Sequence, residues 1–318
     1  MMCVFTKEEL QTYSGKRVLV TGATGFIGGH LLLALQALEA DVALITRDKT
    51  CLIKGAHVFV GSIRDKSYLE DALQAWQPAV IFHLAGSRER VLTHEAFIDS
   101  VDTNLIGTLN LIFSAVKLTP MPRVVVMGTA EEYGGNAAPF VEAMRELPVS
   151  AYSFSKQCVT HLSQLMSSSL GLPVTVIRPS VAYGPGQQSD MFLPALIQSL
   201  LQGKEFSMTL GEQTRDYVYV TDVVDALLKA GQHIELSGQV INVGSGESIK
   251  IKDLVNKVER MLEVSQKVLL GAVPYRVGES MDYCLDITQA KKLMGWKPQT
   301  LLDDGLKCTI AWYRKNLE

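Results

Sequence analysis

The stretch Gly22-Ala23-Thr24-Gly25-Phe26-Ile27-Gly28 decides the fold of this 318-residue chain. The apolar run 17–21 precedes it and is typical of a short buried strand, and the leucine-rich run 26–38 indicates a helix. A glycine-rich turn between a strand and a helix lets backbone approach phosphate groups, and the helix N-terminus offers N–H groups and partial positive charge. The glycine string alone is weak evidence, but this setting predicts a binding site for a dinucleotide pyrophosphate.

Strand-like and helix-like segments alternate as far as residue 178. The predicted strands are 17–21, 41–46, 56–60, 79–84, 123–127 and 173–177, and the predicted helices are 26–38, 66–75, 98–116 and 152–170. Apolar strands without polar alternation belong in a sheet that is covered on both faces, and helices between the strands imply parallel order. The sequence therefore predicts an α/β fold, a Rossmann-type doubly wound parallel sheet.

The pattern after residue 178 is less regular. It predicts a strand at 239–243 and helices at 191–201, 220–230, 251–262, near Leu293 and at 301–313. We expect an NAD(P)-binding domain, 1–178, and a smaller substrate lobe, 179–318. No low-complexity linker separates the two parts, so we expect interleaved lobes with some chain crossing between them.

Composition narrows the class of protein. A formal charge of −3 gives no reason to expect nucleic acid or an acidic membrane as partner. The five cysteines are scattered and the histidines do not cluster, which argues against a metal site and suits a reducing cytoplasm. The first 14 residues lack a signal-peptide pattern, and no apolar run approaches the ~18 residues of a membrane span. We therefore expect a cytoplasmic protein.

Three residues carry the expected chemistry. Tyr152 and Lys156 are four apart on a predicted helix and share a face. A lysine ammonium favours the phenolate and lowers a tyrosine pKa from about 10, so that the tyrosine can pass a proton to or from a sugar hydroxyl while a hydride moves. Thr129 lies just past the fifth strand, at the end where parallel sheets bind ligands.

The chain resembles the extended short-chain dehydrogenase/reductase family, in its nucleotide-sugar epimerase, dehydratase and reductase branch. The resemblance covers residues 16–298 and rests on the glycine loop, Thr129, Tyr152 and Lys156 together with further segments in family order. These are His83-Leu84-Ala85-Gly86, Asn104-Leu105-Ile106-Gly107-Thr108, Arg178-Pro179, Tyr183-Gly184-Pro185-Gly186, Gly211-Glu212-Gln213-Thr214-Arg215-Asp216, Tyr219-Val220-Thr221-Asp222, Asn242-Val243-Gly244-Ser245-Gly246, Tyr275-Arg276 and Leu293-Met294-Gly295-Trp296-Lys297-Pro298.

The resemblance implies a role for each matching position. Thr129, Tyr152 and Lys156 match the catalytic triad. The cofactor set is Gly22, Thr24, Gly25, Phe26, Ile27, Gly28, Arg47, Ser62, Ile63, Leu84, Ala85, Gly86, Asn104, Lys156 and Pro179. The substrate set is Ser87, Arg88, Glu131, Val181, Met191, Arg215 and Arg276, in which Arg215 and Arg276 match arginines that hold the substrate diphosphate. The resemblance also implies a homodimer.

Four positions depart from the family pattern, one of them Ser62, which stands where an Asp often contacts adenine. Thr46 stands where NAD-preferring members carry an acidic residue, and Arg47 follows it, which favours NADP over NAD; Asp48 takes the acidic role if the strand ends later. Ala130 replaces an acid of the 4,6-dehydratases and leaves Glu131. Val181 replaces an asparagine that many epimerases carry.

These residues predict an NAD(P)-dependent nucleotide-sugar oxidoreductase acting at sugar C4. Our main expectation is reduction of a nucleoside-diphosphate 4-keto-6-deoxy sugar with NADPH. The alternatives are a 4-epimerase with bound NAD, a 4,6-dehydratase, and a non-catalytic dinucleotide-binding protein of the same fold.

Overall fold

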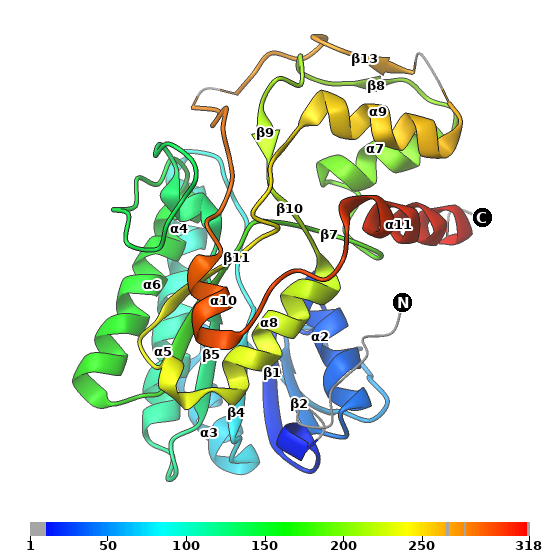
Figure 1. The fold of residues 1–318 in the computed structure, drawn as a ribbon. Coiled ribbons are helices and arrows are strands. Elements are labelled where there is room, and N and C mark those ends of the chain that lie inside the picture. Colours follow the sequence, from blue (N-terminus) through cyan, green and yellow to red (C-terminus); the bar gives the residue numbers. More distant parts are fainter. Residues whose placement is uncertain (1–10, 265–266, 277, 317–318) are drawn as a thin grey trace.

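A single parallel sheet organises the chain, as a computed structural model of residues 11–264, 267–276 and 278–316 shows (Figure 1). Its seven strands run in the order β11-β6-β5-β4-β1-β2-β3, and every neighbouring pair is parallel. Their bounds are β1 Arg17–Thr21, β2 Asp41–Thr46, β3 His57–Val60, β4 Val80–His83, β5 Arg123–Met127, β6 Val174–Pro179 and β11 Val240–Val243. The predicted fold class is confirmed.

Helices cover both faces of the sheet, which explains why the strands are apolar throughout. On one face lie α2 (Phe26–Ala37) and α8 (Val220–Gln232), and on the other lie α3 (Lys66–Trp76), α5 (Gly107–Val116) and α6 (Ala151–Leu170). Neighbouring strand residues point into opposite cores: Val20 packs with the α2 and α8 layer, whereas Leu19 packs with the α3, α5 and α6 layer. Both are fully buried.

The expected helix 98–116 differs from the structure. The helical run begins earlier, as α4 (His94–Ser100), where the Thr93 hydroxyl accepts the Ala96 N–H. It continues through a π-helical segment, Val101–Ile106, before α5. π-Helical turns occur frequently at functional sites, and this one carries the buried Asn104.

The remaining elements form a smaller lobe above the sheet (Figure 1). Its helices are α7 Phe192–Leu201, α9 Ile251–Leu262 and α11 Leu302–Asn316, which share one apolar core. Short strand pairs join β7 Val181–Tyr183 to β10 Tyr217–Tyr219, β9 Thr214–Arg215 to β12 Ile249–Lys250, and β8 Phe206–Ser207 to β13 Val268–Leu269. A short helix, α10 (Thr288–Met294), packs beside β11 and α8. We keep the division at residue 178 as a proposal, with α8 and β11 crossing back to the sheet.

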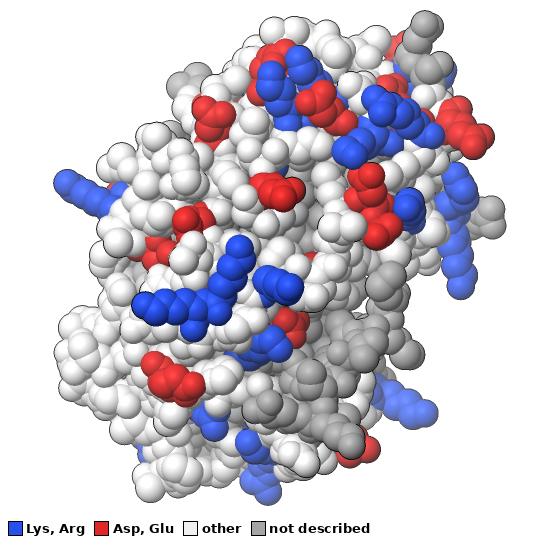
Figure 2. Space-filling view, in the orientation of Figure 1, with Lys and Arg blue, Asp and Glu red and all other residues white. Residues whose placement is uncertain are grey.

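Charge is mixed over the visible surface. Figure 2 shows Lys and Arg interspersed with Asp and Glu. In the part of the chain that the structure describes, no helix is long and apolar enough to cross a membrane. Within those same residues, no three His, Cys, Asp or Glu side chains gather as metal ligands would.

Candidate active site

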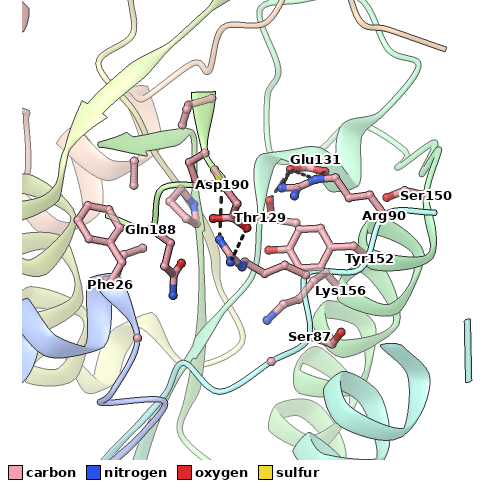
Figure 3. Close-up of a pocket in the computed structure, with 18 of the residues that line it drawn as sticks. Phe26, Ser87, Arg90, Thr129, Glu131, Ser150, Tyr152, Lys156, Gln188 and Asp190 are labelled. Atoms are coloured by element: carbon pink, nitrogen blue, oxygen red, sulfur yellow. Dashed lines mark hydrogen bonds and ion pairs between the residues drawn. The ribbon is translucent and has the colours of Figure 1, made fainter. Parts of the chain in front are cut away.

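The carboxyl ends of the sheet strands open into a cleft of about 1540 Å³ that extends to the smaller lobe. Its lining includes every residue that the sequence assigned to a site except Asn104. Figure 3 shows Phe26, from the start of α2, across the cleft from Tyr152 and Lys156 on α6. The cofactor loop and the catalytic candidates therefore face one shared space.

The glycine loop fits a phosphate-bearing ligand because two of its positions exclude any side chain. Gly22 has φ of +75°, and a Cβ there would lie 2.6 Å from the Ala85 backbone nitrogen. A Cβ on Gly28 would lie 2.1 Å from the Gly22 carbonyl oxygen. Gly25 is the N-cap of α2 and supplies no side-chain cap, so nothing at the cap competes with an anion for the first-turn N–H groups.

The end of β2 brings Thr46, Arg47 and Asp48 to the cleft lining. Thr46 is buried, and its hydroxyl accepts the Asp48 N–H at 3.1 Å. The Asp48 carboxylate accepts the hydroxyl and the N–H of Thr50 at 2.7 and 2.8 Å, and these hydrogen bonds lower the pKa of Asp48. Arg47 is exposed and lines the cleft.

Asn104 lies behind the cleft wall rather than in it. Its side-chain oxygen accepts the Ser87 N–H at 2.7 Å, and its amide nitrogen donates to the Ser87 carbonyl and the Ser155 hydroxyl at 3.1 and 2.8 Å. The cofactor contact expected of Asn104 stays a prediction, and in this structure its amide holds the backbone that follows β4.

Thr129, Tyr152 and Lys156 come together from two elements. Thr129 follows β5 and caps a 3₁₀ turn, Ala130–Tyr133, by accepting the Glu131 N–H at 3.2 Å. Tyr152 and Lys156 lie in the first two turns of α6, whose N-cap is Ser150. The Lys156 Nζ donates to the Met127 carbonyl at 2.7 Å. The arrangement brings a phenol, a hydroxyl and an ammonium to one wall.

The pKa of Tyr152 differs from the prediction made from the sequence. Burial, with the charge of Glu131, raises the pKa of Tyr152 to about 12, although Arg90 and a hydrogen bond with Thr129 act to lower it. Burial lowers the pKa of Lys156 to about 8, against the opposing charge of Glu132. The expected lowering of the tyrosine pKa is not seen in this structure, because burial and then the charge of Glu131 outweigh Arg90 and the hydrogen bond with Thr129.

Glu132 holds Thr129 from behind, and the sequence analysis did not single it out. Its Oε1 accepts the Thr129 N–H at 2.9 Å, and its Oε2 accepts the Thr160 hydroxyl at 2.7 Å and the Arg178 guanidinium at 2.6 Å. Glu132 and Arg178 are fully buried. The spacing of Thr129 and Glu132 is that of a capping box, which is a signal readable from sequence.

Glu131 lines the cleft and pairs with Arg90, another residue that the sequence analysis missed. The Arg90 Nε and Nη2 donate to the two Glu131 oxygens at 3.0 and 2.6 Å. The guanidinium carbon lies 5.3 Å from the centre of the Tyr152 ring, and Figure 3 shows the pair beside that ring. Arg90 follows β4 in an irregular run with no sequence pattern, so only the tertiary fold reveals it.

Two of the expected substrate arginines are engaged by carboxylates. Arg88 lies 3.5 Å from the Asp190 carboxylate, and Arg215 pairs with Glu279. Arg276 is exposed at the cleft. The other lining residues of the expected substrate set are Ser87, Val181 and Met191.

A doubly wound sheet, a bare glycine loop at a helix N-terminus and a tyrosine–lysine pair in the same cleft define a dinucleotide-dependent enzyme. The model of the NAD dependent epimerase/dehydratase family matches residues 18–244, and the chain belongs to this family. The resemblance drawn from the motifs is confirmed.

Similar proteins include several 4-epimerases. UDP-glucuronate 4-epimerase 2 from Arabidopsis thaliana is 29% identical over 98% of this chain and 78% of its own length. The structure of UDP-glucose 4-epimerase with UDP-glucose from Thermotoga maritima has a TM-score of 0.88 at 28% identity, covering 95% of this chain and 100% of that chain. UDP-glucuronic acid 4-epimerase from Bacillus cereus, in complex with UDP-glucuronic acid and NAD, has a TM-score of 0.85 at 26% identity, covering 95% and 100%.

Proposed function

We propose that this chain is a nucleoside-diphosphate-sugar 4-epimerase that uses bound NAD. The observation that best supports this proposal is that the cleft lined by the glycine loop is also lined by Thr129, Tyr152 and Lys156. The similar 4-epimerases support oxidation at C4 followed by return of the hydride. They do not support the net reduction that was our main expectation from the sequence.

The site residues divide the work around one sugar oxygen. Tyr152 takes the proton of the C4 hydroxyl during oxidation and gives it back during reduction, and Thr129 holds the same oxygen by a hydrogen bond. Lys156 binds the nicotinamide ribose, while the charge of Arg90 and the hydrogen bond with Thr129 act against the raised pKa of Tyr152. NAD, when bound at the glycine loop, supplies a hydride acceptor. Rotation of the ketosugar in the cleft between the two hydride transfers inverts C4.

The 4,6-dehydratase alternative has less support from the site. Water elimination needs acid and base groups beside the threonine, and the residue after Thr129 is the fully buried Ala130. The remaining acid, Glu131, accepts hydrogen bonds from two nitrogens of Arg90. A carboxylate committed to an ion pair is a poor proton shuttle.

Tyr152→Phe tests the proposed role of the tyrosine. We expect a loss of at least about 100-fold in kcat, because the proton transfer step loses its acid and base. Conversion of UDP-glucose to its C4 epimer, followed by proton NMR, measures the rate, and the NAD content of purified protein checks that cofactor binding is intact. An unchanged rate in Tyr152→Phe contradicts the mechanism, and no turnover by the wild type favours a non-catalytic dinucleotide-binding protein.

Reduction of a 4-keto-6-deoxy sugar with NADPH is the second candidate, favoured by the end of β2. Thr46 cannot repel a 2′-phosphate and Arg47 can neutralise one, while Asp48 is bonded to Thr50. A lower KM for NADPH than for NADH, with loss of cofactor during purification, indicates the reductase. Tightly retained NAD indicates the epimerase.

We also propose a homodimer through the face of α4 and α6. Ile98, Phe154 and Leu165 are 49, 41 and 53% exposed there, a large apolar exposure for two neighbouring helices. Light scattering after size exclusion measures the mass, and Leu165→Lys is expected to shift a dimer to monomer.

A further inference from the structure

The sugar end of the cleft carries an ion pair of its own. The side chains of Arg90 and Glu131 are 36 and 30% exposed, so both are accessible from the cleft they line. Two Arg90 nitrogens meet two Glu131 oxygens, which is the fork geometry in which a guanidinium recognises any carboxylate. The Arg90 guanidinium therefore forms a binding site for a carboxylate, and in this structure the Glu131 carboxylate already occupies it.

The pair lies close to the place expected for the two ring carbons that flank C4 of the sugar, C3 and C5. This step rests on the proposed function, in which Tyr152 and Thr129 hold the C4 oxygen, and the C5 substituent is two bonds from C4. The Arg90 guanidinium lies over the Tyr152 ring, and Glu131 donates its N–H to the Thr129 hydroxyl. We place the C5 substituent, rather than the C3 hydroxyl, against the Arg90–Glu131 pair.

We propose that Glu131 acts as an internal carboxylate that occupies Arg90 and restricts the site to nucleotide sugars with an uncharged C5 substituent. A uronate carboxylate would have to displace Glu131 from Arg90 and then share one guanidinium with it. Two carboxylates at a partly buried site repel each other, and one of them loses its partner. A hydroxymethyl or methyl group meets no such opposition.

UDP-glucose and UDP-glucuronic acid are a matched pair of probes because they differ only in the oxidation state of C6. Calorimetric titration of the NAD-loaded enzyme gives a Kd for each. We expect the wild type to bind UDP-glucose at least about tenfold more tightly, because juxtaposed like charges are costly. Wild type with equal affinity, or with a preference for UDP-glucuronic acid, overturns the proposal without any variant.

Glu131→Gln is expected to remove most of this discrimination by freeing the Arg90 charge for the ligand. Glu89→Gln is the matched control: its carboxylate accepts the backbone N–H groups of Arg90 and Val91 at 2.9 and 3.1 Å, and the structure gives it no bond to the guanidinium. The control is expected to keep the wild-type ratio. Adding Arg90→Gln to Glu131→Gln is expected to abolish the gained affinity for UDP-glucuronic acid.

An unchanged Kd ratio in Glu131→Gln overturns the role of Glu131 while leaving the proposed reaction intact. A shifted ratio in an enzyme that turns over neither sugar supports the specificity role and rejects the proposed reaction. Binding of neither probe by the wild type overturns both.

Discussion

His83 illustrates how a single side chain beneath the cleft is kept neutral. It ends β4 and is 2% exposed. Its two ring nitrogens lie 2.7 Å from the Thr21 hydroxyl and 2.9 Å from the Thr108 hydroxyl. Burial, and then the charge of Lys156, lower the pKa of His83 from 6.5 to about 3. The backbone strip Leu84 to Gly86, which lines the cleft, begins at the next residue.

The lowered pKa of His83 predicts that the folded protein loses stability as the pH falls. Below pH 6.5 the unfolded chain binds a proton at His83, whereas the folded chain does not until about pH 3. The free energy of unfolding therefore falls as the pH drops through this window, by about 1.4 kcal/mol per pH unit from this one group. Urea unfolding at pH 7.0, 6.0 and 5.0 measures the slope.

His83→Gln is the comparison for that slope. Glutamine can bond both hydroxyls but has no proton to bind, so we expect a dependence flatter by about one proton between pH 6 and 5. Equal slopes for the two proteins would show that His83 is not the titrating group.

Sequence identified the cleft residues whose roles depend on local motifs. The ends of strands and helices fix the positions of Gly22, Gly28, Thr129 and Tyr152. The spacing of these residues in the sequence was therefore enough to predict that they line the cleft. Arg90 could not be found this way, because it acts on Glu131 across 41 positions and no periodicity links them. The predicted direction of the Tyr152 pKa shift was also wrong, since burial and the surrounding charges depend on the tertiary structure.

At the scale of elements, the junction of β1 and α2 tolerates side chains at some glycines and not at others. Gly28→Ala places a Cβ 2.1 Å from the Gly22 carbonyl oxygen, so the loop must move. We expect destabilisation of about 1–3 kcal/mol and loss of NAD retention. Thermal unfolding and the NAD content of purified protein measure the two effects.

Gly29→Ala is the matched control one residue further along α2. A Cβ there lies 3.7 Å from the Ala23 carbonyl oxygen, an ordinary contact. We expect NAD retention to be unchanged and stability to rise by up to about 1 kcal/mol from helix propensity. Similar NAD loss in both variants would show that the loop contact is not the cause.

The bounds of strands and helices were predicted to within a few residues where one hydrophobic period runs through the whole element. The strands β1, β2 and β5 have the predicted bounds because their apolar runs are bounded by polar or glycine residues. The π-helical segment before α5 was not predicted, since its sequence, Val101–Ile106, is compatible with an α-helix. Asn104, which lies in this π-helical segment, forms hydrogen bonds with Ser87 and Ser155, and the sequence pattern does not reveal these contacts.

At the scale of the molecule, Asn242 joins segments far apart in sequence. It is fully buried in β11. Its side-chain oxygen accepts the Tyr133 hydroxyl at 2.7 Å, and its amide nitrogen donates to the Phe140 and Asp286 carbonyls at 3.0 and 3.2 Å. One side chain thus ties the sheet edge to the turn after Thr129 and to the C-terminal segment.

Asn242→Ala is expected to cost about 3 kcal/mol of unfolding free energy, because it leaves buried polar groups without partners. Asn136→Ala is the control, since Asn136 is only partly buried and bonds the Tyr133 and Arg145 carbonyls within its own loop. There we expect a cost of under about 1 kcal/mol. Urea unfolding of both variants measures the difference, and equal costs would contradict the bridging role of Asn242.

The pairing of β11 with β6 has a consequence for protein synthesis. A ribosome completes β6 at Pro179 after its first partner, β5, but its second partner, β11, emerges only after residues 180–239 have been made. Until then β6 presents an open row of N–H and C=O groups, the kind of edge to which other chains add. A message truncated in this interval would encode the whole glycine loop and all three catalytic candidates, yet its product would be prone to aggregate.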